Sequence, residues 1–285
     1  MPFGNSTVAF IGAGVMGEAF IKGLLKKQLL MSEQIIAADV HADRGKTLVE
    51  RYPGLRFTSD NVEATESADI LVLSVKPQAL GKVLSVCRGK ADSCSLILSI
   101  VAGAPMRRIA DDLLNARVVR AMPNTPGQIG QGITVWTAAP GVQELQHRQA
   151  EALLGALGEQ IYVEEERFLD MATALSGTGP AYVFLFMEAL VDAGVHMGFS
   201  RRDAEKLVLQ TLRGSVEYAL ESKLHPAELR NQVTSPGGTT ASALYQLEKG
   251  GLRTVIARAI WAAYQRSAEL GSGTEKLVPN GGDGN

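Results

Sequence analysis

Glycine, serine and threonine gather in two short stretches of the sequence where they could bind an anion. The first is GAGVMG at residues 12–17, with the spacing GxGxxG, and the second is VTSPGGTT at residues 233–240. Backbone amides that glycine leaves accessible, at the positive end of a helix, bind phosphates and carboxylates. The alternative for each stretch is a turn that only caps a helix.

The context of the first stretch favours nucleotide binding. It lies between an apolar run that predicts a strand and a segment of helical periodicity from Val15. In such a turn Gly12 makes the tight bend, Gly14 lets a pyrophosphate approach and Gly17 lets the helix pack on the strand. The predicted nucleotide-binding residues are Gly12, Ala13, Gly14, Val15, Met16 and Gly17.

An acidic residue, Asp39, ends the next predicted strand, where dinucleotide-binding proteins hold the adenosine ribose. A carboxylate there accepts hydrogen bonds from the 2′-hydroxyl of NAD and repels the 2′-phosphate of NADP. Arg44 and His41 follow closely and could favour a phosphate, and Asn61 could reach the same ribose. The residues alone leave NADH and NADPH open.

Residues 1–164 alternate apolar, β-branched runs with helical patterns. Strands are predicted at 8–13, 33–39, 69–75, 94–101, 117–122 and 133–138. Continuous apolar strands separated by helices indicate a mostly parallel sheet covered on both faces. We therefore expect residues 1–164 to form an α/β Rossmann domain with a doubly wound sheet.

Helical patterns continue without strands over residues 165–270. The segment 180–198 is apolar on nearly every side, so a partner subunit is expected to cover it. We predict an all-α domain at 165–270. The remaining residues, 271–285, are polar and rich in glycine, and are predicted to be disordered.

Four further stretches are predicted at loops where open α/β sheets bind ligands: SVKP at 74–77, SIVAG at 99–103, MPNTP at 122–126 and, in the helical domain, LSGTGPAY at 175–182. Lys76 could be a surface cation and nothing more. Asn124, between two prolines, is either a turn former or a polar group held over a nicotinamide.

The composition is that of an ordinary globular protein. The 285 residues are 46% hydrophobic and carry a net charge of −2, without the basic excess of nucleic-acid-binding proteins. Two cysteines, Cys87 and Cys94, without a CxxC motif, indicate a reducing compartment and predict neither a disulfide framework nor a metal site. We expect no signal peptide, and the most apolar run, 181–190, is too short to span a membrane. The prediction is a cytoplasmic protein.

With these motifs assembled, the chain resembles the pyrroline-5-carboxylate reductases, which complete proline biosynthesis. GAGVMG, VKP, MPNTP, LSGTGPAY and VTSPGGTT carry the resemblance, in this order, between Val8 and about Leu270. The resemblance implies a Rossmann domain followed by a helical dimerisation and substrate domain, with dimers that commonly assemble further. It also implies hydride transfer from NADPH or NADH to the imine carbon of 1-pyrroline-5-carboxylate, in a site between the Rossmann domain of one subunit and the helical domain of a neighbour.

The resemblance also assigns roles to residues. Residues 12–17 would hold the pyrophosphate, and Asp39 and Asn61 would face the adenosine ribose. The nicotinamide half would be lined by Ser74, Val75, Lys76, Pro77, Ile100, Val101, Ala102 and Asn124. The substrate carboxylate would bind Ser235 and the amides of Gly238, Thr239 and Thr240. The Thr240 hydroxyl would hydrogen-bond the ring nitrogen and is the candidate proton donor.

The sequence departs from the family pattern at two of these motifs. Thr178 stands where Ser is commoner, which keeps the hydroxyl. Asp39 stands where enzymes that prefer NADPH more often have Ser, Thr or Asn, so the resemblance leaves NADPH and NADH as alternatives.

The same residues bear on three other classes of protein. The β-hydroxyacid dehydrogenases share the domain order but carry a catalytic lysine on the long helix, and residues 181–195 contain none. A reductase of another cyclic imine and a non-catalytic NAD(P)-sensing protein stay as alternatives. The sensor would need the dinucleotide turn but not VTSPGGTT.

Overall fold

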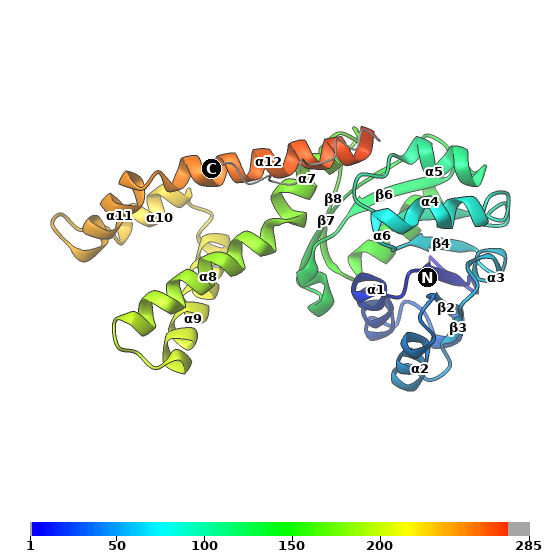
Figure 1. Ribbon diagram of the computed structural model, residues 1–285, viewed down its shortest axis with the longest axis horizontal. Coiled ribbons are helices and arrows are strands. Elements are labelled where there is room, and N and C mark those ends of the chain that lie inside the picture. Colours follow the sequence, from blue (N-terminus) through cyan, green and yellow to red (C-terminus); the bar gives the residue numbers. More distant parts are fainter. Residues whose placement is uncertain (1, 273–285) are drawn as a thin grey trace, which may run out of the picture. The chain divides into compact units, whose positions relative to one another are not determined.

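A computed structural model describes residues 2–272 of the chain (Figure 1). The described residues divide into two compact units, one made of those up to Thr178 together with those from Ala263 on, and the other of Gly179–Ala262. The predicted boundary at residue 165 follows the change from strands to helices, whereas the compact units divide at Thr178. Most of the tail predicted to be disordered, from residue 273 on, lies outside the described residues.

The first unit contains an eight-stranded sheet of order β3-β2-β1-β4-β5-β6-β7-β8. All neighbouring strands are parallel except β6 and β7, which confirms the expected mostly parallel sheet. The strands are β1 Val8–Ile11, β2 Ile35–Ala38, β3 Arg56–Thr58, β4 Ile70–Leu73, β5 Leu96–Ser99, β6 Val118–Met122, β7 Gly132–Ala138 and β8 Gly158–Tyr162.

Six of these strands lie within or against the predicted ranges, whereas β3 and β8 are not among the predictions. Both are edge strands of the sheet. β3 has three residues, none of them buried, and β8 (GEQIY) is largely exposed. Neither strand therefore has the continuous apolar pattern that marks the buried strands.

Helices cover both faces of the sheet, and each face has its own core. Successive side chains of β1 point to opposite faces of the sheet, so Phe10 belongs to one core and Ile11 belongs to the other. The core with Phe10 is closed by α1, α2 and α6, and the core with Ile11 by α3, α4 and α5. The helices of this unit are α1 Val15–Lys26, α2 Ala42–Arg51, α3 Asn61–Glu66, α4 Pro77–Val86, α5 Met106–Leu113, α6 Glu144–Gly155 and α7 Phe168–Ala172.

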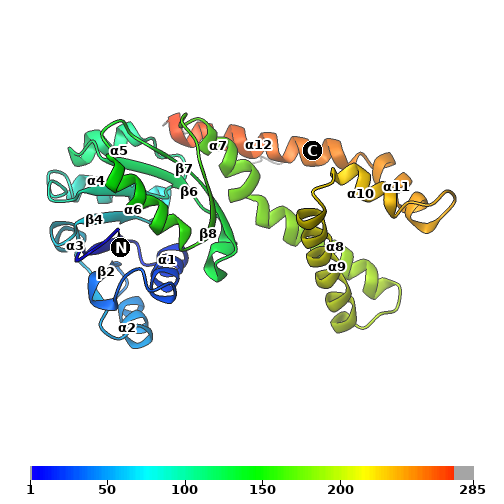
Figure 2. The same cartoon turned by 180° about the vertical axis from the view of Figure 1, so that it is seen from behind.

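The second unit is helical (Figure 2). Its helices are α8 Gly179–His196, α9 Arg201–Ser222, α10 Pro226–Gln232, α11 Thr239–Lys249 and the first part of α12 Leu252–Ser272. A short connection joins α8 to α9, where Ser200 caps α9 by accepting a hydrogen bond from the Asp203 amide (3.1 Å). The two helices approach closely where Gly194 of α8 faces Ala204 of α9.

The apolar surface of α8 is exposed in the single chain. Phe184 and Leu185 are 60% and 67% exposed. The helical run Phe168–His196 is longer than the apolar stretch at 181–190, and by length and composition alone it could cross a membrane. An exposed surface of this kind needs a covering, which a partner subunit or a lipid bilayer could provide.

Candidate active site

The glycine-rich turn after β1 has the geometry of a pyrophosphate site. Gly12 has φ +97°, and a Cβ atom there would lie 2.8 Å from the carbonyl carbon and oxygen of Ser74, so only glycine fits. Gly17 packs against the Gly12 carbonyl. By contrast, a Cβ atom at Gly14 would meet nothing within 4 Å, which leaves room for a ligand.

The amides that follow this turn are available to an anion. Gly14 is the N-cap of α1, and among the described residues no side chain caps that helix. The first amides of a helix have no acceptor within the helix, so those of Val15, Met16 and Gly17 face its N-terminal end. The turn and the helix therefore fit the pyrophosphate of a dinucleotide.

The loops after β1 and β4 meet where the strand order reverses, the usual ligand position in this fold. The Ser74 hydroxyl donates to the Gly12 carbonyl (2.8 Å), and the Ser74 amide donates to the Ile11 carbonyl (2.9 Å). Ser74 therefore positions the glycine-rich turn. Lys76 is exposed at the N-cap of α4, and Pro77 begins that helix.

Ala13 is held on both of its backbone groups by side chains that follow β2. Its amide donates to Asp39 Oδ2 (3.1 Å), and its carbonyl accepts from Arg44 Nε (2.6 Å). The other Asp39 oxygen accepts from the His41 amide at 3.1 Å and lies 2.9 Å from the His41 ring. The Ala13 amide is thus occupied by Asp39 and is not offered to a phosphate in this structure.

Arg44 is held in turn by Glu18, in the first turn of α1, which also pairs with Arg51. Partial burial raises the pKa of Glu18, but hydrogen bonds and charge attraction from the two arginines outweigh it. The pKa of Glu18 is therefore lowered from 4.5. Glu18 is an anion at neutral pH, and it keeps the Arg44 guanidinium beside the turn.

Asn61 begins α3, directly after the strand that neighbours β2. The Asp39 amide donates to the carbonyl of Thr58 at the end of that strand (3.3 Å). Asp39 and Asn61 therefore lie at the carboxyl ends of adjacent strands. Asp60 caps α3 by accepting from the Val62 amide (2.8 Å).

The loop after β5 shares a cavity of about 210 Å³ with the start of α4. Pro77, Val101 and Ala102 line it, together with Arg108 and residues of α12 such as Arg266. Val101 is 2% exposed and contributes to the core. The structure thus brings three of the residues predicted for the nicotinamide half around one hollow.

Asn124 begins a turn, since its backbone carbonyl accepts from the Gly127 amide (3.1 Å), and its side-chain Oδ1 accepts from the Ile133 amide of β7 (3.0 Å). This bond fixes the orientation of the carboxamide and leaves its NH₂ group for a ligand. The neighbouring Met122 methyl packs on Gly177, where a Cβ atom would lie 2.6 Å from it. The MPNTP and LSGTGPAY motifs are therefore in contact.

Part of LSGTGPAY forms a π-helical turn, Thr173–Gly177. The Thr178 amide and hydroxyl both donate to the Thr173 carbonyl at 2.8 Å, and the Ser176 hydroxyl donates to the Ala172 carbonyl at 3.0 Å. Such turns are rare and occur often at functional sites. The sequence patterns above predict a helix here, but they do not predict that one turn of it is π-helical.

In the second unit, residues 235–238 of VTSPGGTT form a type II turn. The Gly238 amide donates to the Ser235 carbonyl (3.1 Å), with Pro236 second and Gly237 third at φ +73°. The Ser235 hydroxyl lies over the turn, 2.8 Å from where a Cβ atom at Gly238 would be. The turn interpretation is therefore correct for these four residues.

The same turn leads directly into α11. Gly238 is the N-cap, and no described side chain caps this helix either. The amides of Thr239 and Thr240 therefore lack intrahelical acceptors and are open to an anion, whereas the Gly238 amide serves the turn. The turn and an anion cradle are compatible.

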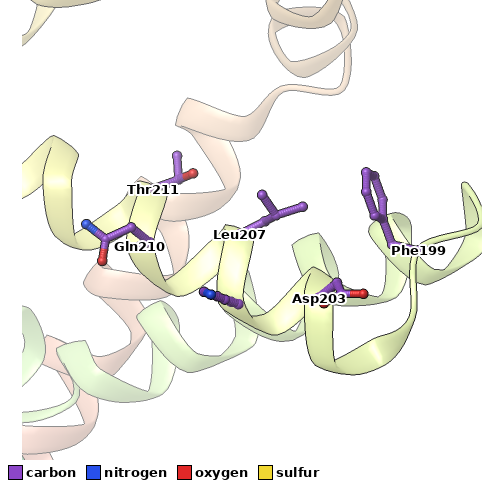
Figure 3. A pocket seen from close by; sticks show the side chains of 6 residues that line it. Phe199, Asp203, Leu207, Gln210 and Thr211 are labelled. Atoms are coloured by element: carbon purple, nitrogen blue, oxygen red, sulfur yellow. The ribbon is translucent and has the colours of Figure 1, made fainter.

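A separate cavity of about 480 Å³ lies along α9 and is lined by Phe199, Asp203, Lys206, Leu207, Gln210 and Thr211 (Figure 3). None of the predicted site residues lines it. No group of three or more potential metal ligands occurs among residues 2–272.

Comparison with known proteins gives matches over nearly the whole chain. The family described as pyrroline-5-carboxylate reductase dimerisation matches residues 166–270, and that described as NADP oxidoreductase coenzyme F420-dependent matches residues 7–103. The pyrroline-5-carboxylate reductase of Synechocystis is 42% identical over 93% of this chain and 98% of its own. That of Pseudomonas aeruginosa is 42% identical over 92% and 96%.

Solved structures agree with these matches. Plasmodium falciparum pyrroline carboxylate reductase with NADP bound has a TM-score of 0.85 at 32% identity, over 94% of this chain and 98% of its own. The Coxiella burnetii pyrroline-5-carboxylate reductase has a TM-score of 0.84 at 36% identity, over 93% and 98%. Fold and sequence therefore point to one family.

Proposed function

The chain belongs to the pyrroline-5-carboxylate reductase family, and we propose that it reduces 1-pyrroline-5-carboxylate to L-proline with NADPH or NADH. This reaction is the last step of proline biosynthesis. The observation that carries the proposal is the presence of two anion-binding arrangements on one chain. One fits the pyrophosphate of a dinucleotide, and the other, at the start of α11, fits a small carboxylate.

The substrate carboxylate binds at the start of α11 in this proposal. The amides of Thr239 and Thr240 donate to its oxygens, assisted by the positive end of the helix. The Ser235 hydroxyl adds a donor beside them, and the Gly238 amide keeps the turn in shape. Gly238 therefore acts mainly by allowing the turn to close.

Thr240 acts on the ring nitrogen in this proposal. When bound, the reduced nicotinamide supplies the hydride that reaches the imine carbon. The imine accepts hydride better when its nitrogen is protonated, and VTSPGGTT contains no carboxyl or imidazole group. The Thr240 hydroxyl donates a hydrogen bond to that nitrogen and relays a proton from water, so its contribution is chiefly orientation.

The cofactor lies along the carboxyl ends of the strands. The amides of Val15, Met16 and Gly17 hold the pyrophosphate, and Asp39 and Asn61 hold the adenosine ribose. The nicotinamide half is lined by Ser74, Val75, Lys76, Pro77, Ile100, Val101, Ala102 and Asn124. Val101 contributes through its backbone, since its side chain is in the core.

The protein is a homo-oligomer, as the match to the dimerisation family indicates. In the proposal a second copy covers the exposed apolar surface of α8, and dimers assemble further. The proposal places the protein in the cytoplasm, with no membrane or nucleic acid as partner.

An initial-rate assay tests the reaction. Purified protein is mixed with 1-pyrroline-5-carboxylate and either NADH or NADPH, and the nicotinamide absorbance is followed while proline is assayed. We expect oxidation of the cofactor with one proline formed for each cofactor oxidised. Turnover only with a different cyclic imine, or no turnover by a folded protein that binds the cofactor, would overturn the proposal in favour of the two alternatives.

A further inference from the structure

We propose that this chain selects NADH over NADPH, with Asp39 as the residue that excludes a 2′-phosphate and Glu18 as the residue that keeps Arg44 from binding one. The inference rests on the proposed function for the class of cofactor. It goes beyond that function by assigning the preference to particular side chains.

Hydrogen bonds to two backbone amides hold the Asp39 carboxylate in one orientation. Its two oxygens accept from the amides of Ala13 and His41, and the side chain is 15% exposed. A carboxylate has about four acceptor positions, so others remain for the hydroxyls of a ribose. A phosphate ester at the same place would face a fixed negative charge at close range.

The cations that could offset this charge are paired. Between residues 39 and 51 the cationic side chains are His41, Arg44, Lys46 and Arg51. The His41 ring contacts Asp39 itself, and Lys46 forms an ion pair with Asp43 (3.0 Å). Both arginines form ion pairs with Glu18. No unpaired guanidinium is therefore present in this segment to receive a phosphate, the role that Arg often has in NADP sites.

Arg44 is the cation that lies nearest the turn, because its Nε donates to the Ala13 carbonyl. Glu18 takes one of its terminal nitrogens and is itself 16% exposed. A phosphate bound by Arg44 would have to share the guanidinium with the Glu18 carboxylate, whose negative charge would repel it at close range. Glu18 is therefore a positioning residue for cofactor choice, acting through Arg44.

Equilibrium binding of NADH and NADPH to the full-length protein, measured by cofactor fluorescence without substrate, tests the proposal. We expect NADH to bind at least about tenfold more tightly, the factor that corresponds to a repulsion of roughly 1.4 kcal/mol. Asp39→Asn keeps the size and the acceptor oxygen, and should tighten NADPH about tenfold while weakening NADH a few-fold. Glu18→Gln should tighten NADPH severalfold with little change for NADH.

Glu50→Gln is the matched control. Glu50 lies on the same helix as Arg44 and is exposed, and its replacement removes the same charge without releasing Lys46 or either arginine. The ratio of NADPH to NADH affinity of this variant should stay within about twofold of the wild type. An equal change in Glu50→Gln and Asp39→Asn, or wild-type protein that binds NADPH as tightly as NADH, would overturn the proposal.

The outcome is separable from that of the proposed function. Selective NADH binding by a protein that does not reduce 1-pyrroline-5-carboxylate would support the selectivity and overturn the reaction. Reduction of the imine with equal use of both cofactors would support the reaction and overturn the selectivity. A folded protein that binds neither cofactor would overturn both.

Discussion

Arg120 and Asp170 form an ion pair inside the first unit, with Nη2 of the arginine 3.0 Å from Oδ1 of the aspartate. Arg120 is a β6 residue with a side chain 5% exposed, and its Nη1 lies 2.9 Å from Glu166. The Ser267 hydroxyl of α12 donates to the same Asp170 oxygen (3.0 Å). One buried guanidinium therefore joins the sheet to α7 and, through Asp170, to the end of α12.

Replacing this arginine should destabilise the protein strongly. Arg120→Met removes the cation and leaves two partly buried carboxylates without it, which costs about 3 kcal/mol. Arg148→Met, which removes an exposed cation paired with Glu144, should cost less than about 0.5 kcal/mol. Urea unfolding at one protein concentration measures both, and equal losses would show that the Arg120 pairs do not contribute.

Acid should remove the contribution of Glu18. Because the pKa of Glu18 is below 4.5 in the folded protein, its pairs with Arg44 and Arg51 stabilise the fold above pH 4.5. That stability is lost as the pH falls from 4.5 through the folded pKa. The difference in unfolding free energy between wild type and Glu18→Gln, about 2 kcal/mol at pH 7, should be constant down to pH 5 and shrink below 4.5. A difference that does not change with pH would contradict the prediction.

The two cysteines should be unreactive in the folded protein. Burial raises the pKa of Cys94 to about 11 and also raises that of Cys87, and both side chains are at most 1% exposed. At pH 8 we expect thiol labelling at least about a hundredfold slower than in urea, where both should react. Rapid labelling of one thiol in the folded protein would show that this side of the sheet opens.

Thr240 should matter for the reaction and not for the fold. Thr240→Ala removes the hydroxyl but keeps the amide, so kcat/KM should fall roughly ten- to a thousandfold with unchanged cofactor affinity. Ser242→Ala, an exposed change in the same helix, serves as control and should be close to wild type. Steady-state kinetics with 1-pyrroline-5-carboxylate measure both, and a near-normal Thr240→Ala enzyme would remove Thr240 from the mechanism.

Local chemistry explains what could be predicted from the sequence. The glycines at 12 and 17 are needed because neighbouring carbonyls leave no room for a side chain, and the pattern GxGxxG expresses that need. Pro236 followed by Gly237 likewise predicts a turn, which the structure shows to be of type II. Apolar runs located the buried strands.

Side-chain pairings between distant segments could not be predicted in the same way. Nothing in the periodicity of β6 indicates that Arg120 meets carboxylates 46 and 50 residues later. Asp39 was predicted for the ribose, but its bond to the Ala13 amide depends on the β1–β2 register. The π turn at 173–177 has the same apolar pattern as an ordinary helix.

Transfer of deuterium is the most direct test of the proposed reaction. The protein is given 1-pyrroline-5-carboxylate and NADH with both C4 hydrogens replaced by deuterium, and the product is analysed by mass spectrometry and NMR. We predict L-proline with one deuterium on the δ carbon, the ring carbon that carried the C=N bond. Proline without deuterium, or no proline from a folded protein that binds NADH, would contradict the account.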